Sequence, residues 1–228
     1  MPINGVKAGQ RRNDPEKETI IWDLDPRKMA LIVMDMQNCF CAPGGAIEVP
    51  ASRGIVPKIN QLALACRTRG IPVIWVGWGL RPDGSDNGLA CYFSPDFHKN
   101  LKKEPMGLAI GAKGTQIYHE LKVMPEDYHV KKIRFSALID GASDLERMLR
   151  TMERDIIIIT GTTTDVCCES TAKDAMMLDF KVIFISDATA TYTEDRHNTT
   201  LSSIRRRLGM VCATDELIEE LENQMRHD

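Results

Sequence analysis

The sequence lacks any long apolar run, although 43% of its 228 residues are hydrophobic. No stretch approaches the ~18 consecutive apolar residues that a membrane-spanning helix needs, so we expect no membrane partner. The N-terminus, MPINGVKAGQRRNDPEKE, is polar and charged, so we do not expect a secretory signal. The chain also lacks a basic excess. Its 29 Lys and Arg against 32 Asp and Glu give a net charge of −3, which gives no reason to expect a nucleic-acid partner.

Seven cysteines are present, an odd number with no spacing typical of a small disulfide-bonded domain. We therefore predict reduced thiols in a cytoplasmic protein. Internal repeats and low-complexity segments are absent, and the length suits a single domain over residues 1–228. Residues 1–20 are charged and have no apolar periodicity, so we interpret them as a mobile N-terminal arm.

The most informative stretch is Asp155–Ala175, DIIIITGTTTDVCCESTAKDA. Its four consecutive isoleucines predict a strand that is buried on both faces, as in a parallel sheet. Gly161 breaks this strand, and the residues that follow predict a helix beginning near Cys167. The dipole of a helix favours the thiolate of a cysteine at its N-terminus. We therefore predict that Cys167 is a nucleophile.

Segments typical of strands and of helices alternate along the whole chain. The predicted strands are Met29–Met34, Pro72–Val76, Tyr128–Val130, Asp155–Thr160, Lys181–Ile185 and Met210–Cys212. The predicted helices are Ile55–Arg69, Thr115–Leu121, Asp144–Met152, Cys167–Asp179, Thr193–Leu208 and Asp215–Met225. This alternation predicts an α/β, Rossmann-like fold of three layers, with a six-stranded, mostly parallel sheet and helices on both faces. We interpret the irregular segment Gly77–Gly114 as a cover over the site.

Three predicted strand ends carry reactive side chains, namely Asp35, Lys132 and Cys167. The carboxyl ends of parallel strands meet at one edge of a sheet, where ligands bind in α/β proteins. An ammonium group favours a nearby thiolate, and a carboxylate can take the thiol proton and later protonate a leaving amine. The turn Gly161–Cys167 leaves backbone N–H groups free for an oxyanion. Together these groups predict acyl transfer through a thioester.

Three segments of the chain resemble the isochorismatase-like cysteine hydrolases, a superfamily that includes N-carbamoylsarcosine amidohydrolase, ureidoacrylate hydrolase, biuret hydrolase and nicotinamidase. ALIVMDMQNCF (Ala30–Phe40) resembles the family's strand ending in Asp-x-Gln-Asn. KKIRFSAL (Lys131–Leu138) resembles its Lys-x-Arg-Tyr-Ser-Ala-Phe stretch. GTTTDVCCESTAKDA (Gly161–Ala175) resembles its cysteine signature. The resemblance implies the isochorismatase-like hydrolase fold.

The resemblance also implies a role for each reactive residue. Asp35 would be the general acid and base, Lys132 the charge partner and Cys167 the nucleophile. The N–H groups of Thr163 and Cys167 would form the oxyanion hole. Members of the family often carry a non-proline cis peptide just before the first of these residues, which here would be the bond Thr162–Thr163.

Five further residues are candidates for substrate binding, namely Gln37, Asn38, Trp78, Arg134 and Phe135. Trp78, just past a predicted strand, could form a pocket wall or part of the core, since aromatic side chains serve both purposes. Arg134 could bind a substrate carboxylate or form a structural ion pair. Phe135 stands where the family commonly has Tyr, so this chain lacks one hydroxyl group there.

Nicotinamidases hold a metal through an Asp and histidines shortly after their first two strands, whereas this chain has no His before His98. We therefore expect neither a metal nor a cofactor. The segment SPDFHK (Ser94–Lys99) resembles a stretch of ureidoacrylate hydrolases and favours ureido or carbamoyl substrates. The predicted protein is a cysteine-dependent amidase that cleaves a C–N bond of a small linear amide, ureido or carbamoyl compound, and forms a homo-dimer or homo-tetramer.

Three alternatives remain open at this point. A catalytically silent member of the family would bind a small metabolite or a partner. A papain-like hydrolase would use His129 as the base for its thiol. A zinc site would use Cys39 and Cys41, although C-x-C is not the usual ligand spacing and no second ligand pair is visible.

Overall fold

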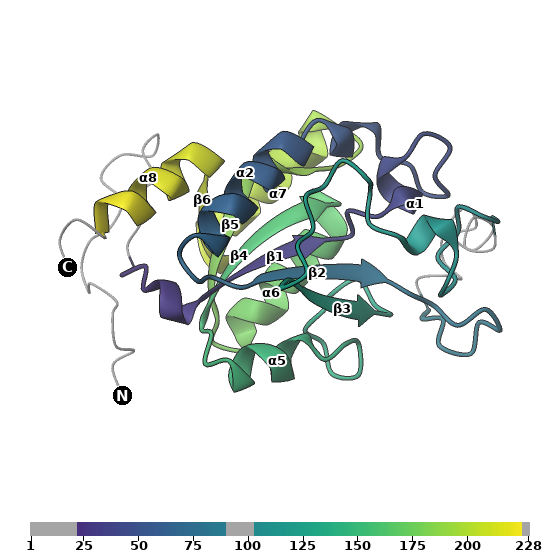
Figure 1. Ribbon diagram of the computed structural model, residues 1–228, viewed down its shortest axis with the longest axis horizontal. Helices are drawn as coiled ribbons and strands as arrows, with labels where there is room; N and C mark the ends of the chain where they lie inside the picture. Colours follow the sequence, from purple (N-terminus) through teal and green to yellow (C-terminus); the bar gives the residue numbers. More distant parts are fainter. Residues whose placement is uncertain (1–21, 90–102, 225–228) are drawn as a thin grey trace.

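The computed structural model of the protein describes residues 22–89 and 103–224. The predicted N-terminal arm, the SPDFHK segment and His98 lie outside the described residues. The described part of the chain is built around one central sheet, and the carboxyl ends of its strands point toward the right in Figure 1.

The sheet has six strands in the order β3-β2-β1-β4-β5-β6, and all neighbouring strands are parallel. The strands are β1 Met29–Met34, β2 Val73–Trp78, β3 Tyr128–Lys132, β4 Ile156–Thr162, β5 Lys181–Ala190 and β6 Met210–Cys212. Every residue of β1 and β4 is buried, as expected for central parallel strands that helices cover on both faces. The predicted α/β fold is confirmed, and the sheet is parallel throughout.

Helices on both faces of the sheet give the molecule three layers. In Figure 1, α2 and α8 lie over one face and α5 and α6 over the other. The α-helices are α1 Asn38–Cys41, α2 Val56–Arg67, α5 Leu145–Thr151, α6 Glu169–Met177, α7 Glu194–Ser203 and α8 Thr214–Gln224. The π-helical turns are η4 Thr164–Cys168 and η5 Ile204–Leu208, and the 3-10 turns are η1 Pro26–Lys28, η2 Pro50–Arg53 and η3 Lys113–Thr115.

The predicted helix over Thr115–Leu121 is wrong. The 3-10 turn η3 ends at the first of these residues, and Ile117 then forms an antiparallel bridge with Gln37. The backbone N–H of Tyr118 donates to the carbonyl of Met36 at 2.9 Å, a bond that joins this segment to the chain just after β1. Tertiary pairing therefore overrides the local helical preference.

β5 continues to Ala190, beyond its predicted end at Ile185. Its pairing with β4 shifts register between Ile159 and Gly161, so residues 185–188 bulge out of the regular ladder. The bulge contains the polar Ser-Asp pair at which the sequence predicted the end of the strand. A bulge can hold polar residues within a strand because it takes them out of the regular pairing.

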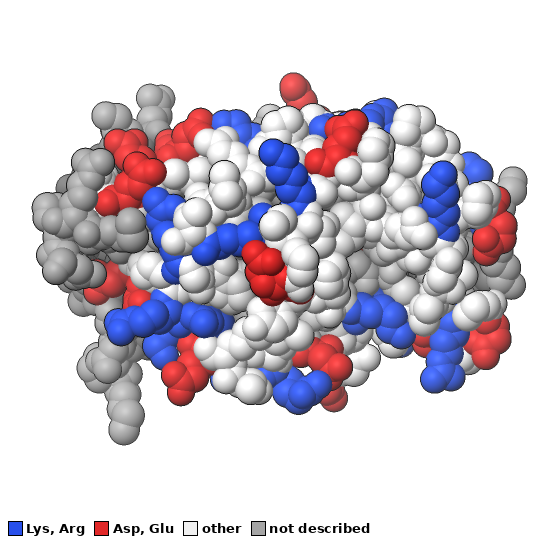
Figure 2. Space-filling view, in the orientation of Figure 1, with Lys and Arg blue, Asp and Glu red and all other residues white. Residues whose placement is uncertain are grey.

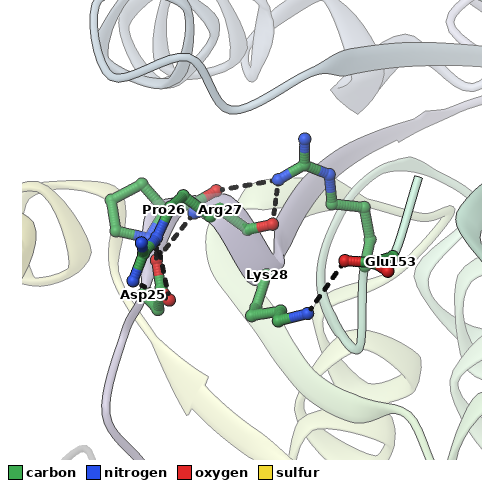
Figure 3. Close-up of polar contacts among 6 residues, drawn as sticks. Asp25, Pro26, Arg27, Lys28 and Glu153 are labelled. Atoms are coloured by element: carbon green, nitrogen blue, oxygen red, sulfur yellow. Dashed lines mark hydrogen bonds and ion pairs between the residues drawn. The ribbon is translucent and has the colours of Figure 1, made fainter.

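Two contacts join the start of β1 to the turn before β4, as Figure 3 shows. The guanidinium of Arg154 donates to the backbone carbonyls of Pro26 and Arg27. Lys28 Nζ lies 3.6 Å from a carboxylate oxygen of Glu153. These contacts hold the N-terminal ends of two neighbouring strands side by side, at the end of the sheet away from their carboxyl ends.

The surface carries charges of both signs. Figure 2 shows Lys and Arg side chains interspersed with Asp and Glu, and the described part of this face has no large field of one sign. Within residues 22–89 and 103–224, no helix combines the length and the apolar character needed to cross a membrane.

Candidate active site

Asp35 directly follows β1 and turns the chain out of the sheet. Its φ is +52°, in the left-handed region that Asp adopts more readily than most residues. Its backbone N–H still donates to the carbonyl of Val76 in β2 at 2.7 Å. The residue is completely buried. Its carboxylate is therefore held out of water at the carboxyl edge of the sheet.

Lys132 is the last residue of β3 and is as fully buried as Asp35. Its Nζ lies 3.0 Å from Asp35 Oδ2 and 3.4 Å from Cys167 Sγ. It also donates to the carbonyl of Arg134 at 3.0 Å. The ammonium therefore makes two hydrogen bonds and one ion pair. The buried charge is tolerated because it is both paired and hydrogen-bonded.

Cys167 lies in η4, the π-helical turn that connects β4 to α6. Helical backbone begins at Thr164, earlier than predicted, so the thiol lies inside the first turn. The peptide bond Thr162–Thr163 is cis, at the place that the resemblance implies. Gly161 has φ +106°, and a Cβ there would lie 2.1 Å from the carbonyl oxygen of Met34. Glycine is therefore needed where β4 passes β1, just before the turn η4.

The backbone N–H groups of Thr163 and Cys167 lie at the start of the turn that follows β4. The carbonyl of Thr163 accepts hydrogen bonds from the N–H of Val166 at 3.3 Å and from the N–H of Cys168 at 3.1 Å. The N–H of Cys167 lies between these two in the chain. Among the backbone hydrogen bonds outside helices and strands in the described residues, none has either N–H as its donor. An oxyanion hole requires N–H donors of this kind beside the reacting atom.

The pKa of the Cys167 thiol is raised to about 12, first by burial and then by the negative charge of Asp35, while the Lys132 ammonium acts to lower it. Burial also raises the pKa of the Asp35 carboxyl, against the lowering effect of Lys132. Lys132 therefore acts on the thiol in the expected direction, but burial and the charge of Asp35 outweigh it. These shifts favour the protonated thiol next to the Lys132–Asp35 ion pair, because one buried ammonium lies beside two groups that can carry a negative charge.

Trp78 is the last residue of β2, so the expectation that it follows the strand is wrong. Lys132 Nζ lies 3.9 Å from the centroid of its ring, and the ring of Phe135 packs edge-on at 5.9 Å. The polar edge of its indole works against burial and lowers the pKa of both Asp35 and Cys167. Trp78 is only 3% exposed. It therefore belongs to the core and to the wall of the site at the same time.

Residues 29–216 of the chain match the isochorismatase domain family. The chain belongs to the isochorismatase family. A ureidoacrylate amidohydrolase, RutB of Pseudomonas savastanoi pv. phaseolicola, is 31% identical over an alignment of 208 positions, and the match covers 85% of this chain and 83% of that protein. A cysteine hydrolase structure from Pseudomonas syringae pv. phaseolicola has a TM-score of 0.82 at 32% identity and covers 92% of this chain and 99% of its own.

A third relative shows how far the fold extends beyond sequence similarity. N-carbamoylsarcosine amidase from Thermoplasma acidophilum has a TM-score of 0.66 at 24% identity, and the match covers 82% of this chain and 97% of the other. The predicted superfamily is therefore confirmed, and amidohydrolase activity is supported at the level of the family.

In this isochorismatase-family protein the side-chain amide of Gln37 binds backbone groups. Its Nε2 donates to the carbonyls of Trp78 at 2.9 Å and Thr115 at 2.7 Å, and its Oε1 accepts from the N–H of Trp78 at 2.8 Å. Nδ2 of Asn38 donates to the carbonyl of Lys113 at 3.0 Å. The two amides hold the end of β1 against β2 and η3, which supports a positioning role for both.

Arg134 is exposed beyond the end of β3. Its Nη1 donates to the carbonyls of Ile133 at 2.7 Å and Asp86 at 3.0 Å. Among the described residues, no carboxylate forms an ion pair with it, so the structural ion pair considered for this residue has no partner there.

The sequence did not predict that α7 contacts the turn η4 and the first residue of α6. His197 Nδ1 lies 3.0 Å from Thr164 Oγ1, and Thr200 Oγ1 donates to Glu169 Oε2 at 3.4 Å. The one available signal was the spacing of His197 and Thr200, three residues apart, which places both on one face of a helix. That face packs on the turn that follows β4.

The alternative base and the alternative zinc ligands lie apart from this arrangement. His129 is exposed on β3, where strand alternation puts it on the opposite face from Lys132. Cys39 and Cys41 are buried, free thiols. Within the described ranges, no three His, Cys, Asp or Glu side chains are grouped closely enough to hold a metal ion.

Proposed function

We propose that this isochorismatase-family protein is a cysteine-dependent amidohydrolase that cleaves a C–N bond of a small linear amide, ureido or carbamoyl compound through a thioester. The observation that carries the proposal is the position of Lys132, whose Nζ contacts both Asp35 and Cys167. Three strand ends thus supply a nucleophile, a proton acceptor and a positive charge between them. A binding module would not need all three.

Acylation starts from the protonated thiol. Asp35 takes the Sγ proton as Cys167 Sγ bonds to the substrate carbonyl carbon, and the carbonyl oxygen becomes an oxyanion. The N–H groups of Thr163 and Cys167 stabilise that oxyanion. When the oxyanion collapses, Asp35 passes the proton to the departing nitrogen. The C–N bond breaks, leaving a free amine and a thioester on the sulfur.

Deacylation repeats these proton transfers with water. Asp35 takes a proton from a water molecule, whose oxygen adds to the thioester carbonyl and forms a second oxyanion at the same N–H groups. Collapse of this oxyanion breaks the C–S bond, and the sulfur regains its proton from Asp35. Lys132 keeps its positive charge and stabilises the negative charge as it moves between Asp35 and Cys167.

Two observations support ureido or carbamoyl substrates. RutB, named as a ureidoacrylate amidohydrolase, is 31% identical to this chain. The exposed guanidinium of Arg134 has no ion pair among the described residues and suits the carboxylate of a ureido acid. Trp78 and Phe135, which pack edge to face beside the thiol, would supply the apolar wall for the substrate.

We also propose a homo-dimer or homo-tetramer located in the cytoplasm. The six cysteines described by the structure are all free, which supports a reducing compartment. The oligomer rests on the family resemblance. Size-exclusion chromatography with light scattering tests it directly, and a monomer at micromolar concentration would contradict it.

Ammonia release from a panel of ureido acids, carbamoyl amino acids, biuret, oxamate and simple amides tests the activity. Wild type is expected to release ammonia from one class, and Cys167→Ser is expected to lose that activity. Equal turnover by both would show that the sulfur is not the nucleophile. Silence of the wild type, together with no reaction of Cys167 with an alkylating agent at any pH, would favour the catalytically silent, ligand-binding alternative.

A further inference from the structure

His197 is a half-buried, titratable residue that the proposed chemistry does not use. It lies on α7, and its Nδ1 is 3.0 Å from the hydroxyl of Thr164. Thr164 is completely buried and directly follows Thr163. Within the described residues, this hydroxyl forms its hydrogen bond with His197. A buried hydroxyl that loses its partner destabilises the conformation that buries it, so this bond constrains the turn.

The ring of His197 is anchored in turn by the bulge of β5. Burial lowers the pKa of His197, while a hydrogen bond with the backbone of Ser186, in the bulge, acts in the opposite direction and raises it. A bond that favours the protonated ring is one in which the ring donates, so the carbonyl of Ser186 accepts it. His197 therefore connects the bulge of β5 with Thr164, the first residue of the turn η4.

Other contacts show that α7 and the end of β5 pack along the same turn. Thr191 Oγ1 donates to Asp165 Oδ1 at 2.5 Å, and Arg196 Nη1 lies 3.8 Å from the other oxygen of that carboxylate. Thr200 Oγ1 donates to Glu169 Oε2 at 3.4 Å. Among these contacts, the bond from His197 reaches the residue adjacent to Thr163. It is therefore the contact closest in the chain to the N–H of Thr163.

We infer that His197 is a positioning residue, which acts through Thr164 to fix the N–H groups of Thr163 and Cys167 where the oxyanion forms. The inference rests on the proposed amidohydrolase activity. The N–H of Thr163 directly precedes the turn that Thr164 begins, and the N–H of Cys167 lies within it. Stabilisation of an oxyanion depends on donors that are fixed in place before the reaction. His197 itself makes no contact with substrate in this account.

The test compares three single variants. Asn at position 197 can place an amide atom where Nδ1 lies, so His197→Asn keeps the bond to Thr164, whereas His197→Leu removes it. Thr164→Val removes the hydroxyl and keeps the shape of the side chain. His197→Leu and Thr164→Val are expected to lower kcat about 10- to 100-fold with little change in KM, because misplaced donors weaken only the transition state. His197→Asn is expected to stay within a few fold of wild type.

Two further measurements separate positioning from a purely structural role. The rate at which iodoacetamide alkylates Cys167 is expected to stay at the wild-type value in all three variants, because the thiol keeps its Asp35 and Lys132 neighbours. The double variant His197→Leu/Thr164→Val is expected to lose no more kcat than either single variant, because both remove the same contact. Thr200→Val, which removes a different contact of α7, serves as the matched control and is expected to keep wild-type kcat.

The outcomes that overturn the inference are distinct from those that overturn the activity. Wild-type silence on the substrate panel, with Cys167→Ser as reference, would remove the amidohydrolase proposal and this inference with it. An active wild type with unchanged kcat in His197→Leu would overturn the inference alone. A loss of kcat in Thr200→Val as large as in His197→Leu, or a loss in His197→Leu that His197→Asn does not restore, would also overturn it.

Discussion

Lys132 Nζ lies 3.4 Å from Cys167 Sγ, and the two residues are 0% and 3% exposed. The contact does not by itself produce a thiolate, because Asp35 occupies the same ammonium at 3.0 Å and adds a negative charge. The raised pKa favours a protonated sulfur, and in the proposed mechanism Asp35 removes the proton during attack. This balance of charges leads to the first prediction.

The alkylation rate of Cys167 is expected to be low at pH 7 and to rise with pH beyond 9, because the pKa of the thiol is raised to about 12 by burial and by the charge of Asp35. Asp35→Asn removes that charge, lowers the pKa of the thiol and should speed alkylation at pH 8. Site-resolved mass spectrometry after iodoacetamide treatment measures both rates. A rate that is already maximal at pH 6, or slower alkylation in Asp35→Asn, would contradict this account.

Removal of the ammonium should destabilise the fold as well as the activity. Lys132→Met leaves the Asp35 carboxylate buried without its ion pair, and breaking a buried pair costs about 3–5 kcal/mol. Urea denaturation is expected to show that loss at pH 7. The double variant Lys132→Met/Asp35→Leu should recover most of the unfolding free energy and no activity. A stable Lys132→Met single variant would show that the pair contributes little to folding.

The contribution of the Trp78 ring, which faces the Lys132 ammonium, should be separable from that of its indole N–H. Trp78→Phe keeps a ring beside the ammonium at the cost of the N–H, whereas Trp78→Leu removes both. Trp78→Leu is therefore expected to lose about 1–2 kcal/mol more unfolding free energy than Trp78→Phe, the size of a desolvated cation–π contact. Both variants should alkylate Cys167 more slowly, because they lack the indole N–H, whose presence lowers the pKa of the thiol. Equal stability of the two would exclude a cation–π contribution.

Gly161 should be irreplaceable for a steric reason. A Cβ there would lie 2.1 Å from the Met34 carbonyl oxygen, at a φ of +106°. Gly161→Ala is therefore expected to prevent accumulation of folded protein. Gly70→Ala is the matched control, since Gly70 also has a positive φ, +68°, but nothing lies within 4 Å of a Cβ there. That control should cost only about 1–2 kcal/mol of backbone strain. Similar melting temperatures for the two would rule out the clash.

Much of the fold can be predicted from the sequence, because it depends on local patterns of residues. Buried apolar runs such as Met29–Met34 and Ile156–Ile159 predict central strands, and both lie where expected. The three reactive residues were also accessible, because parallel topology brings strand ends to one edge. Residues distant in the chain could therefore be placed together before any coordinates were known.

The remaining features depend on contacts that no local pattern encodes. The Thr115–Leu121 segment pairs with Gln37 and its neighbours instead of forming a helix, and β5 continues past a polar pair by means of a bulge. The protonation state of Cys167 depends on how completely the site is buried and on the balance of two opposite charges. The contact between His197 and Thr164 joins two helical segments whose relative placement appears only in three dimensions.

The contacts of Arg154 and Lys28 at the far end of the sheet bear on the alignment of the chemistry itself. β1 and β4 carry Asp35 and Cys167 just past their carboxyl ends, so an error in how the two strands start is passed along to both groups. A slip of one residue would move the carboxylate by about 3.3 Å along the strand and turn its side chain to the other face. Hydrogen bonds and an ion pair a whole strand length away therefore help to fix the distance between the sulfur and the carboxylate, which the proposed proton transfer needs.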